Sequence, residues 1–175
     1  MSQERDILDL QATVARLEAS LGGPLAQMSI SAVGEMYSAA TPAAFATNWL
    51  ALPLPDAAST FVYYTLFLPA GWAGRTLTMK VMWAPSSTNT GNVLWQFITK
   101  DLIAGTTTTS GVTTSSTATS AGPGTTDMPV LVSATATLAG VVTGDAVQVR
   151  IARVGGDAAD TFTGTANFIA LLLSV

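Results

Sequence analysis

Residues 75–99 read RTLTMKVMWAPSSTNTGNVLWQFIT. In the first part of this stretch every second residue is large and apolar: Leu77, Met79, Val81 and Trp83. A period of two is typical of a strand with one buried face. The run 86–91 is rich in turn residues, and beyond it Val93, Trp95 and Phe97 share one face of a second strand. The stretch predicts two strands of one sandwich, with Trp83 and Trp95 buried together.

Similar signals continue on both sides of this stretch. Further strands are predicted at residues 61–68, 130–138, 146–154 and 166–175. The segment between Asp101 and Asp127 carries no charge and is rich in Thr, Ser and Gly. It predicts one or two exposed strands with mobile loops, the loosest at Ser120–Gly124. About eight strands with turn signals at short spacing indicate an all-β fold, a jelly-roll-like β-sandwich over residues 58–175.

The N-terminal segment has a different period. Five apolar residues recur there with heptad spacing: Ile7, Leu10, Val14, Leu17 and Leu21. This pattern predicts a short α-helical coiled coil over residues 1–22, which Gly22-Gly23-Pro24 ends. A helix packed on its own domain would show the same five residues and remains the alternative. The narrow apolar stripe favours the coiled coil, and a helix of this length requires partners in water.

Residues 23–57 connect the helix to the sandwich. Four prolines in this part of the chain (Pro24, Pro42, Pro53 and Pro55) exclude long regular elements. We expect an extended linker or arm with one strand near 30–38. The apolar run 48–55 would wrap its own sandwich or a neighbouring subunit.

The composition excludes several classes of function. The net charge is −4 and only seven residues are Lys or Arg, which predicts no nucleic-acid partner because phosphate binding needs clustered cations. The chain has no Cys and no His, so the commonest general base and metal ligand are missing. No signal peptide is expected, since the first six residues are polar. The longest apolar run, Phe168–Leu173, is far shorter than the roughly 20 residues of a membrane span, which predicts no membrane partner.

No catalytic, metal or cofactor site is expected. Asp157 and Asp160 lie beside Gly155 and Gly156. Two such aspartates are too few for a calcium loop and are interpreted as a solvated hairpin turn. Serine and threonine are abundant, but the chain has no His to activate them. Trp72, at the tip of a hairpin, is the candidate for an exposed residue that stacks on a sugar ring.

Several turn-and-strand motifs resemble a group of small phage virion proteins. The motifs are Leu68–Thr78, with its Leu-Pro-x-Gly-Trp turn, Gly91–Trp95, with its Gly-Asn-Val-x-Trp strand, and the later segments Gly144–Arg153 and Asp160–Gly164. The resemblance covers residues 58–175 and implies a trimeric jelly-roll knob on a capsid, fibre or tail. It brings no catalytic residues. The loop after the second tryptophan strand is Thr-rich here, where the group often has acidic residues.

Together these patterns predict a non-enzymatic virion structural protein. The expected form is a homotrimer that is joined through residues 1–22 and acts as a capsid decoration or cement protein. Its partners would be itself and the major capsid protein or another virion protein, and it would assemble in the host cytoplasm. The alternative is a receptor- or carbohydrate-binding module of a fibre or tail tip.

Overall fold

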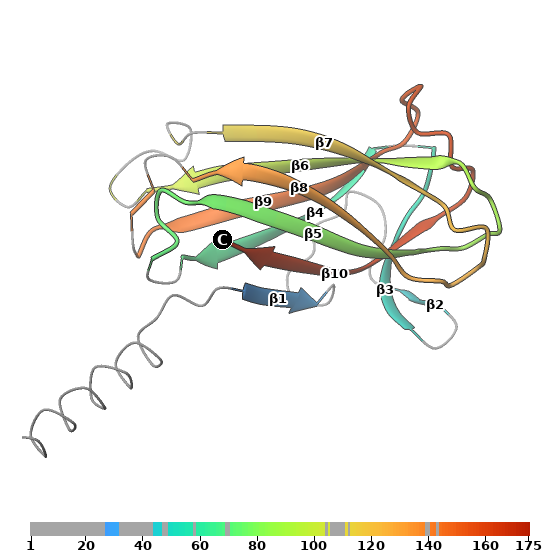
Figure 1. The fold of residues 1–175 in the computed structure, drawn as a ribbon, viewed down its shortest axis with the longest axis horizontal. Helices are drawn as coiled ribbons and strands as arrows, with labels where there is room; N and C mark the ends of the chain where they lie inside the picture. The colour runs from blue at the N-terminus through green and yellow to red at the C-terminus, as the bar shows by residue number, and fades with distance from the viewer. Residues whose placement is uncertain are drawn as a thin grey trace, which may run out of the picture.

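The protein is a sandwich of two antiparallel sheets. The structure, a computed structural model, describes residues 27–31, 44–46, 49–57, 59–68, 71–103, 105, 111, 113–138, 141–142 and 144–175. The six-stranded sheet contains β2, β3, β10, β5 and β8 in that order, with β1 also paired to β10. The four-stranded sheet has the order β4, β9, β6 and β7 (Figure 1). The strands of the described residues are β1 Gln27–Ser31, β2 Ala44–Ala46, β3 Trp49–Leu54, β4 Ser59–Phe67, β5 Thr76–Pro85, β6 Asn92–Leu102, β7 Thr113–Ala121, β8 Val130–Thr137, β9 Ala146–Val154 and β10 Ala166–Ser174.

The chain crosses from one sheet to the other at almost every connection after β4. After β4, only β6 and β7 follow one another within a single sheet, and all registered pairs are antiparallel. Such crossings between two packed sheets are typical of jelly-roll-like sandwiches. The all-β sandwich expected from the sequence is therefore confirmed.

The inner faces of β5 and β6 form the centre of the core. The rings of Trp83 and Trp95 are both fully buried, with centroids 6.0 Å apart. Phe162 meets Trp83 edge to face at 5.6 Å, a geometry that aromatic pairs favour. On the other side of β5, Lys80 is exposed. The alternation in residues 75–99 thus predicted the correct faces of both strands.

The expectation of a loose segment at residues 120–124 was wrong. The indole Nε1 of Trp83 donates a hydrogen bond of 3.1 Å to Ser120 Oγ, which is buried. The backbone N–H of Gly122 donates to Gly91 O at 2.8 Å. A Cβ on Gly122 would lie 2.3 Å from the backbone oxygen of Asn89, so only glycine fits this close approach. The hydrogen bond from the buried Trp83 indole and the close backbone contacts of Gly122 therefore hold the segment in place.

The expected arm contributes strands to the six-stranded sheet. β1 pairs with the C-terminal part of β10, and β3 pairs with its beginning. Leu52 and Leu54 of β3 are fully buried, so the apolar run wraps its own sandwich. The observed strand β1 precedes the expected one at 30–38, most of which lies outside the described residues.

The expected coiled coil lies outside the described residues. This applies to residues 1–22 and to the five heptad positions Ile7, Leu10, Val14, Leu17 and Leu21. The part of the chain that the structure describes contains no helix. Accordingly, it offers no helical segment with the length and apolar character needed to cross a membrane.

Candidate functional site

The outer face of the four-stranded sheet brings together side chains from all four of its strands. Alternate residues of a strand point to opposite faces, and the buried residues of β4, β9 and β6 face the core. The register of β9 with its two neighbours then aligns the remaining residues in adjacent rows. One row holds Tyr63, Arg150 and Ile98, and the next holds Thr65, Gln148 and Lys100. Thr113 of β7 extends the second row beside Lys100.

A hollow of about 290 Å³ lies on this face. Its lining comes from β4, β6, β7 and β9: Tyr63, Ile98, Lys100, Thr113, Gln148 and Arg150. The volume is at the lower end of the roughly 300–1,000 Å³ of small-molecule sites. The lining combines an aromatic ring, aliphatic carbon, an amide, a hydroxyl and two cations. This mixture can hold a small polar ligand that also has an apolar face.

Aromatic rings fix one side of the hollow. Phe61 and Tyr63 are neighbours on the outer face of β4, with centroids 5.3 Å apart and planes at 66°. The guanidinium carbon of Arg150 lies 4.5 Å from the centroid of the Phe61 ring, within the range of a cation–π contact. Phe67, further along the same face of β4, is 76% exposed. An aromatic row therefore runs along the outer face of the edge strand, half-buried at Phe61 and Tyr63 and exposed at Phe67, and one of its members orients a hollow-lining arginine.

Two cations of this face have no acidic partner. Among the described residues, the only ion pair joins Arg153 to Asp160. The Nε atom of Arg150 is buried and takes part in no hydrogen bond. Lys100 is only partly buried and also lines the hollow. The Lys100 ammonium and the Nη groups of Arg150, which have no acidic partner among the described residues, are consequently the donors available to a ligand in the hollow.

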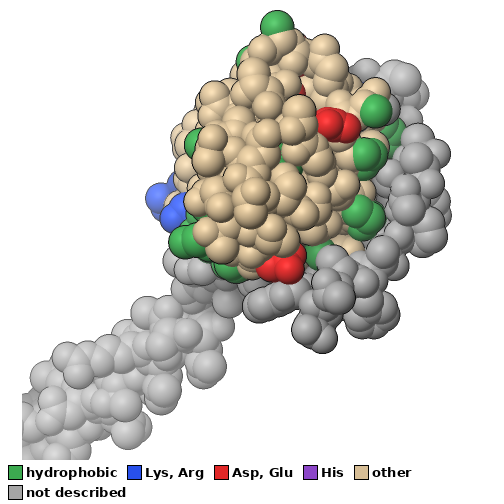
Figure 2. All heavy atoms as spheres, turned by 90° about the vertical axis from the view of Figure 1, so that its right-hand side faces the viewer, with side chains coloured by type: hydrophobic (Ala, Val, Ile, Leu, Met, Phe, Trp, Pro, Cys, Tyr) green, Lys and Arg blue, Asp and Glu red, His purple; other side chains and the backbone are tan. Residues whose placement is uncertain are grey.

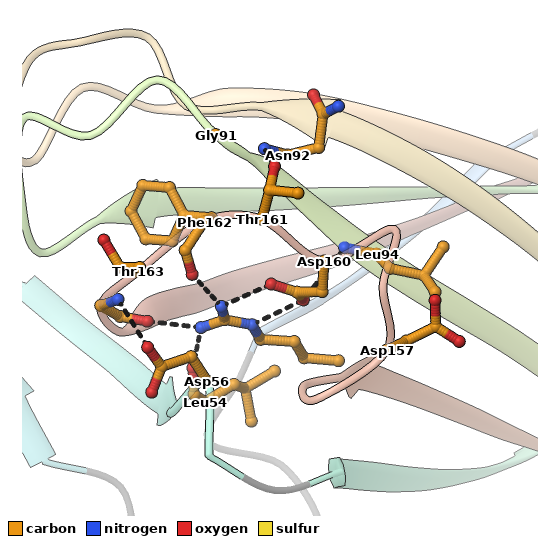
Figure 3. A network of polar contacts seen from close by, with 12 residues as sticks. Leu54, Asp56, Gly91, Asn92, Leu94, Asp157, Asp160, Thr161, Phe162 and Thr163 are labelled. Carbon is orange, nitrogen blue, oxygen red and sulfur yellow. Dashed lines mark hydrogen bonds and ion pairs between the residues drawn. The ribbon is translucent and has the colours of Figure 1, made fainter.

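A second polar network lies at the end of the sandwich, around Arg153 (Figure 3). The Asp160 carboxylate accepts hydrogen bonds from Arg153 Nε at 2.9 Å and from Nη2 at 2.8 Å. Nη1 donates to the carbonyl oxygen of Leu54 at 3.0 Å and to that of Gly164, and Nη2 donates to that of Phe162. All five donors of the guanidinium are thus used. This network ties β3, β9 and the loop before β10 together, so we assign it a structural role.

The interpretation of Asp160 as solvated was wrong. Its side chain is 1% exposed and Arg153 is fully buried, because the two charges neutralise each other. Asp157 does lie in an exposed turn, where its carboxylate accepts a hydrogen bond of 2.8 Å from the N–H of Ala159. No group of three or more potential metal ligands occurs in the described ranges.

Trp72 is not an exposed stacking residue. The indole is 1% exposed and belongs to the core cluster with Leu138. The cause is the turn around it, in which Gly71 and Gly74 have φ angles of 84° and 70°. Gly74 N–H donates to Leu138 O at 3.1 Å, which closes the turn over the sheet edge and directs the indole inward. The outward aromatic residues lie on β4 instead, where Phe67 is exposed.

The loop end of the sandwich lacks clustered charge. Figure 2 views this end, where the loops after β5, β7 and β9 meet, and shows mainly backbone and uncharged polar side chains with isolated acidic groups. Many of these polar groups are already used within the loops: Asn89 Nδ2 donates to Thr163 Oγ1 at 2.7 Å, and Asn92 N–H donates to Thr161 Oγ1 at 2.9 Å. The sheet face is therefore the stronger candidate site.

No local pattern in the sequence pointed directly to the sheet-face hollow. Tyr63, Lys100, Gln148 and Arg150 are far apart in the chain, and each is an ordinary outward residue of its strand. The register of β9 between β4 and β6 brings them together. The spacing of the aromatic residues along β4 was the one available hint, since Phe61, Tyr63 and Phe67 share the parity of outward positions.

Comparisons with known proteins bear on the fold. No protein-family model and no curated protein sequence matches the chain. A family 35 carbohydrate-binding module from an environmental isolate has a TM-score of 0.53 at 12% identity, covering 85% of this chain and 92% of that chain. The CBM36-1 domain of a multidomain xylanase from the hindgut metagenome of Trinervitermes trinervoides has a TM-score of 0.52 at 14% identity, covering 85% and 97%.

A third similar structure is a family 35 carbohydrate-binding module from Cellvibrio japonicus, with a TM-score of 0.50 at 11% identity, covering 85% of this chain and 93% of that chain. Likeness at such low identity concerns the fold alone. It confirms a jelly-roll-like sandwich, whereas a phage origin stays a prediction. The chain thus shares its architecture with carbohydrate-binding modules.

Proposed function

We propose that the protein is a non-catalytic binding module that recognises a saccharide on the outer face of its four-stranded sheet. The observation that carries this proposal is the hollow lined by Tyr63, Gln148, Lys100 and Arg150 beside the aromatic row of β4. The fold that it shares with carbohydrate-binding modules supports the proposal. This function corresponds to the alternative that the sequence left open.

The chemistry of the hollow suits a sugar ring. A pyranose has one face of C–H groups, which packs on an aromatic ring, and a rim of hydroxyl groups that need donors and acceptors. Tyr63 supplies the ring, and the amide of Gln148 supplies both a donor and an acceptor. Lys100 adds donors, and Thr113 adds a hydroxyl at the margin. Because the hollow is open and lies on a strand face, a chain of sugars can extend beyond it along β4.

Affinity electrophoresis of the full chain in gels that contain a panel of soluble polysaccharides tests this function. At least one polysaccharide should retard the protein, and Tyr63→Ala should abolish the retardation. Leu131→Ala is the matched control, because Leu131 is 59% exposed on β8 of the opposite sheet. Migration of the unmodified chain that no polysaccharide changes would refute the proposal. Equal retardation of the Tyr63→Ala variant would place the site elsewhere.

The virion role remains a separate prediction. It derives from the resemblance over residues 58–175 and from the heptad pattern of residues 1–22, which lies outside the described residues. The homotrimer, a capsid or other virion protein as partner, and location in the virion are predictions of the same kind. A fibre or tail tip that holds a receptor saccharide would use the sheet face described above, with three copies adding avidity.

A further inference from the structure

The sheet-face hollow is positively charged in a protein that is acidic as a whole. The net charge of the chain is −4. The outward positions of β4, β9, β6 and β7 nevertheless contain Lys100 and Arg150 and no Asp or Glu. The nearest acidic residue in the sequence, Asp101, points to the opposite side of β6 and is 4% exposed. The charge of the hollow is therefore not neutralised by its own sheet face.

The two cations are placed to hold one group between them. Lys100 is paired with Gln148, and Arg150 is two residues further along the same face of β9. Diagonal neighbours of this kind lie about 7–8 Å apart, close enough for both long side chains to reach a common anion. Both residues line the same hollow.

Arg150 is held in position without a hydrogen-bond acceptor. The ring of Phe61 covers its guanidinium at 4.5 Å, and its Nε is buried with no partner. The contrast with Arg153 on the same strand is large, since every donor of Arg153 has an acceptor. The enclosed Nε is out of reach of a ligand, but the Nη groups have no acceptor among the described residues and can donate to an anionic oxygen in the hollow.

From these contacts we infer that the saccharide is anionic. A carboxylate or a sulfate ester on the sugar lies between Lys100 and Arg150, while the ring packs on Tyr63. This inference rests on the proposed function, whose site it shares. Guanidinium groups favour carboxylate and sulfate oxygens because their donors form a planar fork. The partly buried setting strengthens the attraction relative to an exposed ion pair.

Matched polysaccharides that differ only in charge test the inference. The probes are polygalacturonate and its methyl ester, and a sulfated galactan and its desulfated form, in affinity gels with the full chain. At least one acidic polymer should bind at least about tenfold more tightly than its neutral partner. Raising the salt concentration from about 0.05 M to about 0.5 M should weaken this binding, because salt screens the charges. If only one of the two acidic polymers retards the protein, the result supports the inference and shows whether the recognised anionic group is a carboxylate or a sulfate.

Charge-matched variants assign the effect to the hollow. Lys100→Gln and Arg150→Gln should each weaken binding of the acidic polymer about tenfold or more and should reduce the difference in affinity between the acidic polymer and its neutral partner. The controls are Lys80→Gln and Arg75→Gln, which remove the same charges from exposed positions outside this sheet. If the Arg150→Gln variant does not fold, the binding of the acidic polymer by the Lys100→Gln variant alone tests the inference.

The two proposals can fail separately. Equal binding of acidic and neutral forms, or unchanged binding by Lys100→Gln, overturns the inference and leaves saccharide binding in place. Retardation by neither acidic polymer also overturns it, while the wider panel of neutral polysaccharides still decides the proposed function. Equal losses in the Lys80→Gln and Lys100→Gln variants would mean that only net charge matters, which likewise overturns it.

Discussion

Replacing Arg153 by methionine would remove the most highly connected polar group that the structure describes. The guanidinium bridges Asp160 to the backbone oxygens of Leu54, Phe162 and Gly164. These acceptors come from β3 and from the loop that leads into β10. Methionine retains most of the aliphatic length, so the change tests the charge and the donors more than the packing.

The expected loss in the free energy of unfolding is about 3–5 kcal/mol, the range for breaking a buried ion pair by removing one partner. The side chains of Arg153 and Asp160 are 0% and 1% exposed, so solvent cannot replace the missing contacts. The Asp160 carboxylate would keep a single hydrogen bond in Figure 3's network, the 3.1 Å bond from Leu94 N–H. A loss of this size is a large share of the roughly 5–15 kcal/mol that stabilises a typical domain.

Urea unfolding followed by far-ultraviolet circular dichroism measures the loss at a fixed protein concentration. Asp160→Asn alone should also destabilise, because it leaves a buried cation. The double variant should lose less than the sum of the two single losses, by about 0.5–3 kcal/mol. Arg75→Met, at an exposed position, should stay within about 0.5 kcal/mol of the unmodified protein. A loss below about 1 kcal/mol for Arg153→Met would refute the reasoning, as would strict additivity of the pair.

Three further predictions concern the core, a buried carboxyl group and assembly. Trp95→Ala should cost about 3–5 kcal/mol through lost burial and a cavity, whereas Lys80→Ala should cost well under about 1 kcal/mol; equal losses in urea melts would contradict the observed faces. Burial, and then the negative charge of Asp145, raise the pKa of Asp101, so the folded state binds its proton more tightly than the unfolded state does. The contribution of Asp101 to the free energy of unfolding is therefore present at low pH and is lost as the pH rises from about 4 through the folded pKa. Asp101→Asn should lessen that loss in melts between about pH 4 and pH 8. Light scattering should find a trimer that the combined change Leu10→Asp and Leu17→Asp disrupts; a monomeric unmodified protein would exclude the coiled coil.

Alternation predicted the strands of the sandwich well because it depends on local geometry alone. The predicted strand 146–154 matches the bounds of β9, Ala146–Val154. The buried positions of β5 and β6 follow the same period of two. Each side chain of a strand takes its face from its parity, whatever the partner strand is. One segment of sequence was therefore enough to place Trp83 and Trp95 in the core.

Turns were harder to predict because distant contacts decide their direction. The turn of Trp72 closes against Leu138, which is 66 positions later in the sequence. The Thr-rich segment between Asp101 and Asp127 predicted one or two exposed strands, of which β7 is one, but it also predicted a loose end at residues 120–124. The bond from Trp83 to Ser120 fixes that end. In both segments the deciding contact joins residues that no local pattern relates.

The two arginines of β9 show how much of the site the sequence could have predicted. Arg150 and Arg153 are three residues apart, and an odd separation in a strand places them on opposite faces. One of them had to point into the sandwich, where a charge requires a partner. The nearest acids along the chain, Asp157 and Asp160, both lie on the loop after the same strand, and Asp160 is the partner. Parity then leaves Arg150 on the outer face, but its place between Tyr63 and Ile98 needs the register of both neighbouring strands. The structural arginine was thus within reach of sequence reasoning, whereas the arginine that we assign to ligand binding became visible only in the assembled sheet.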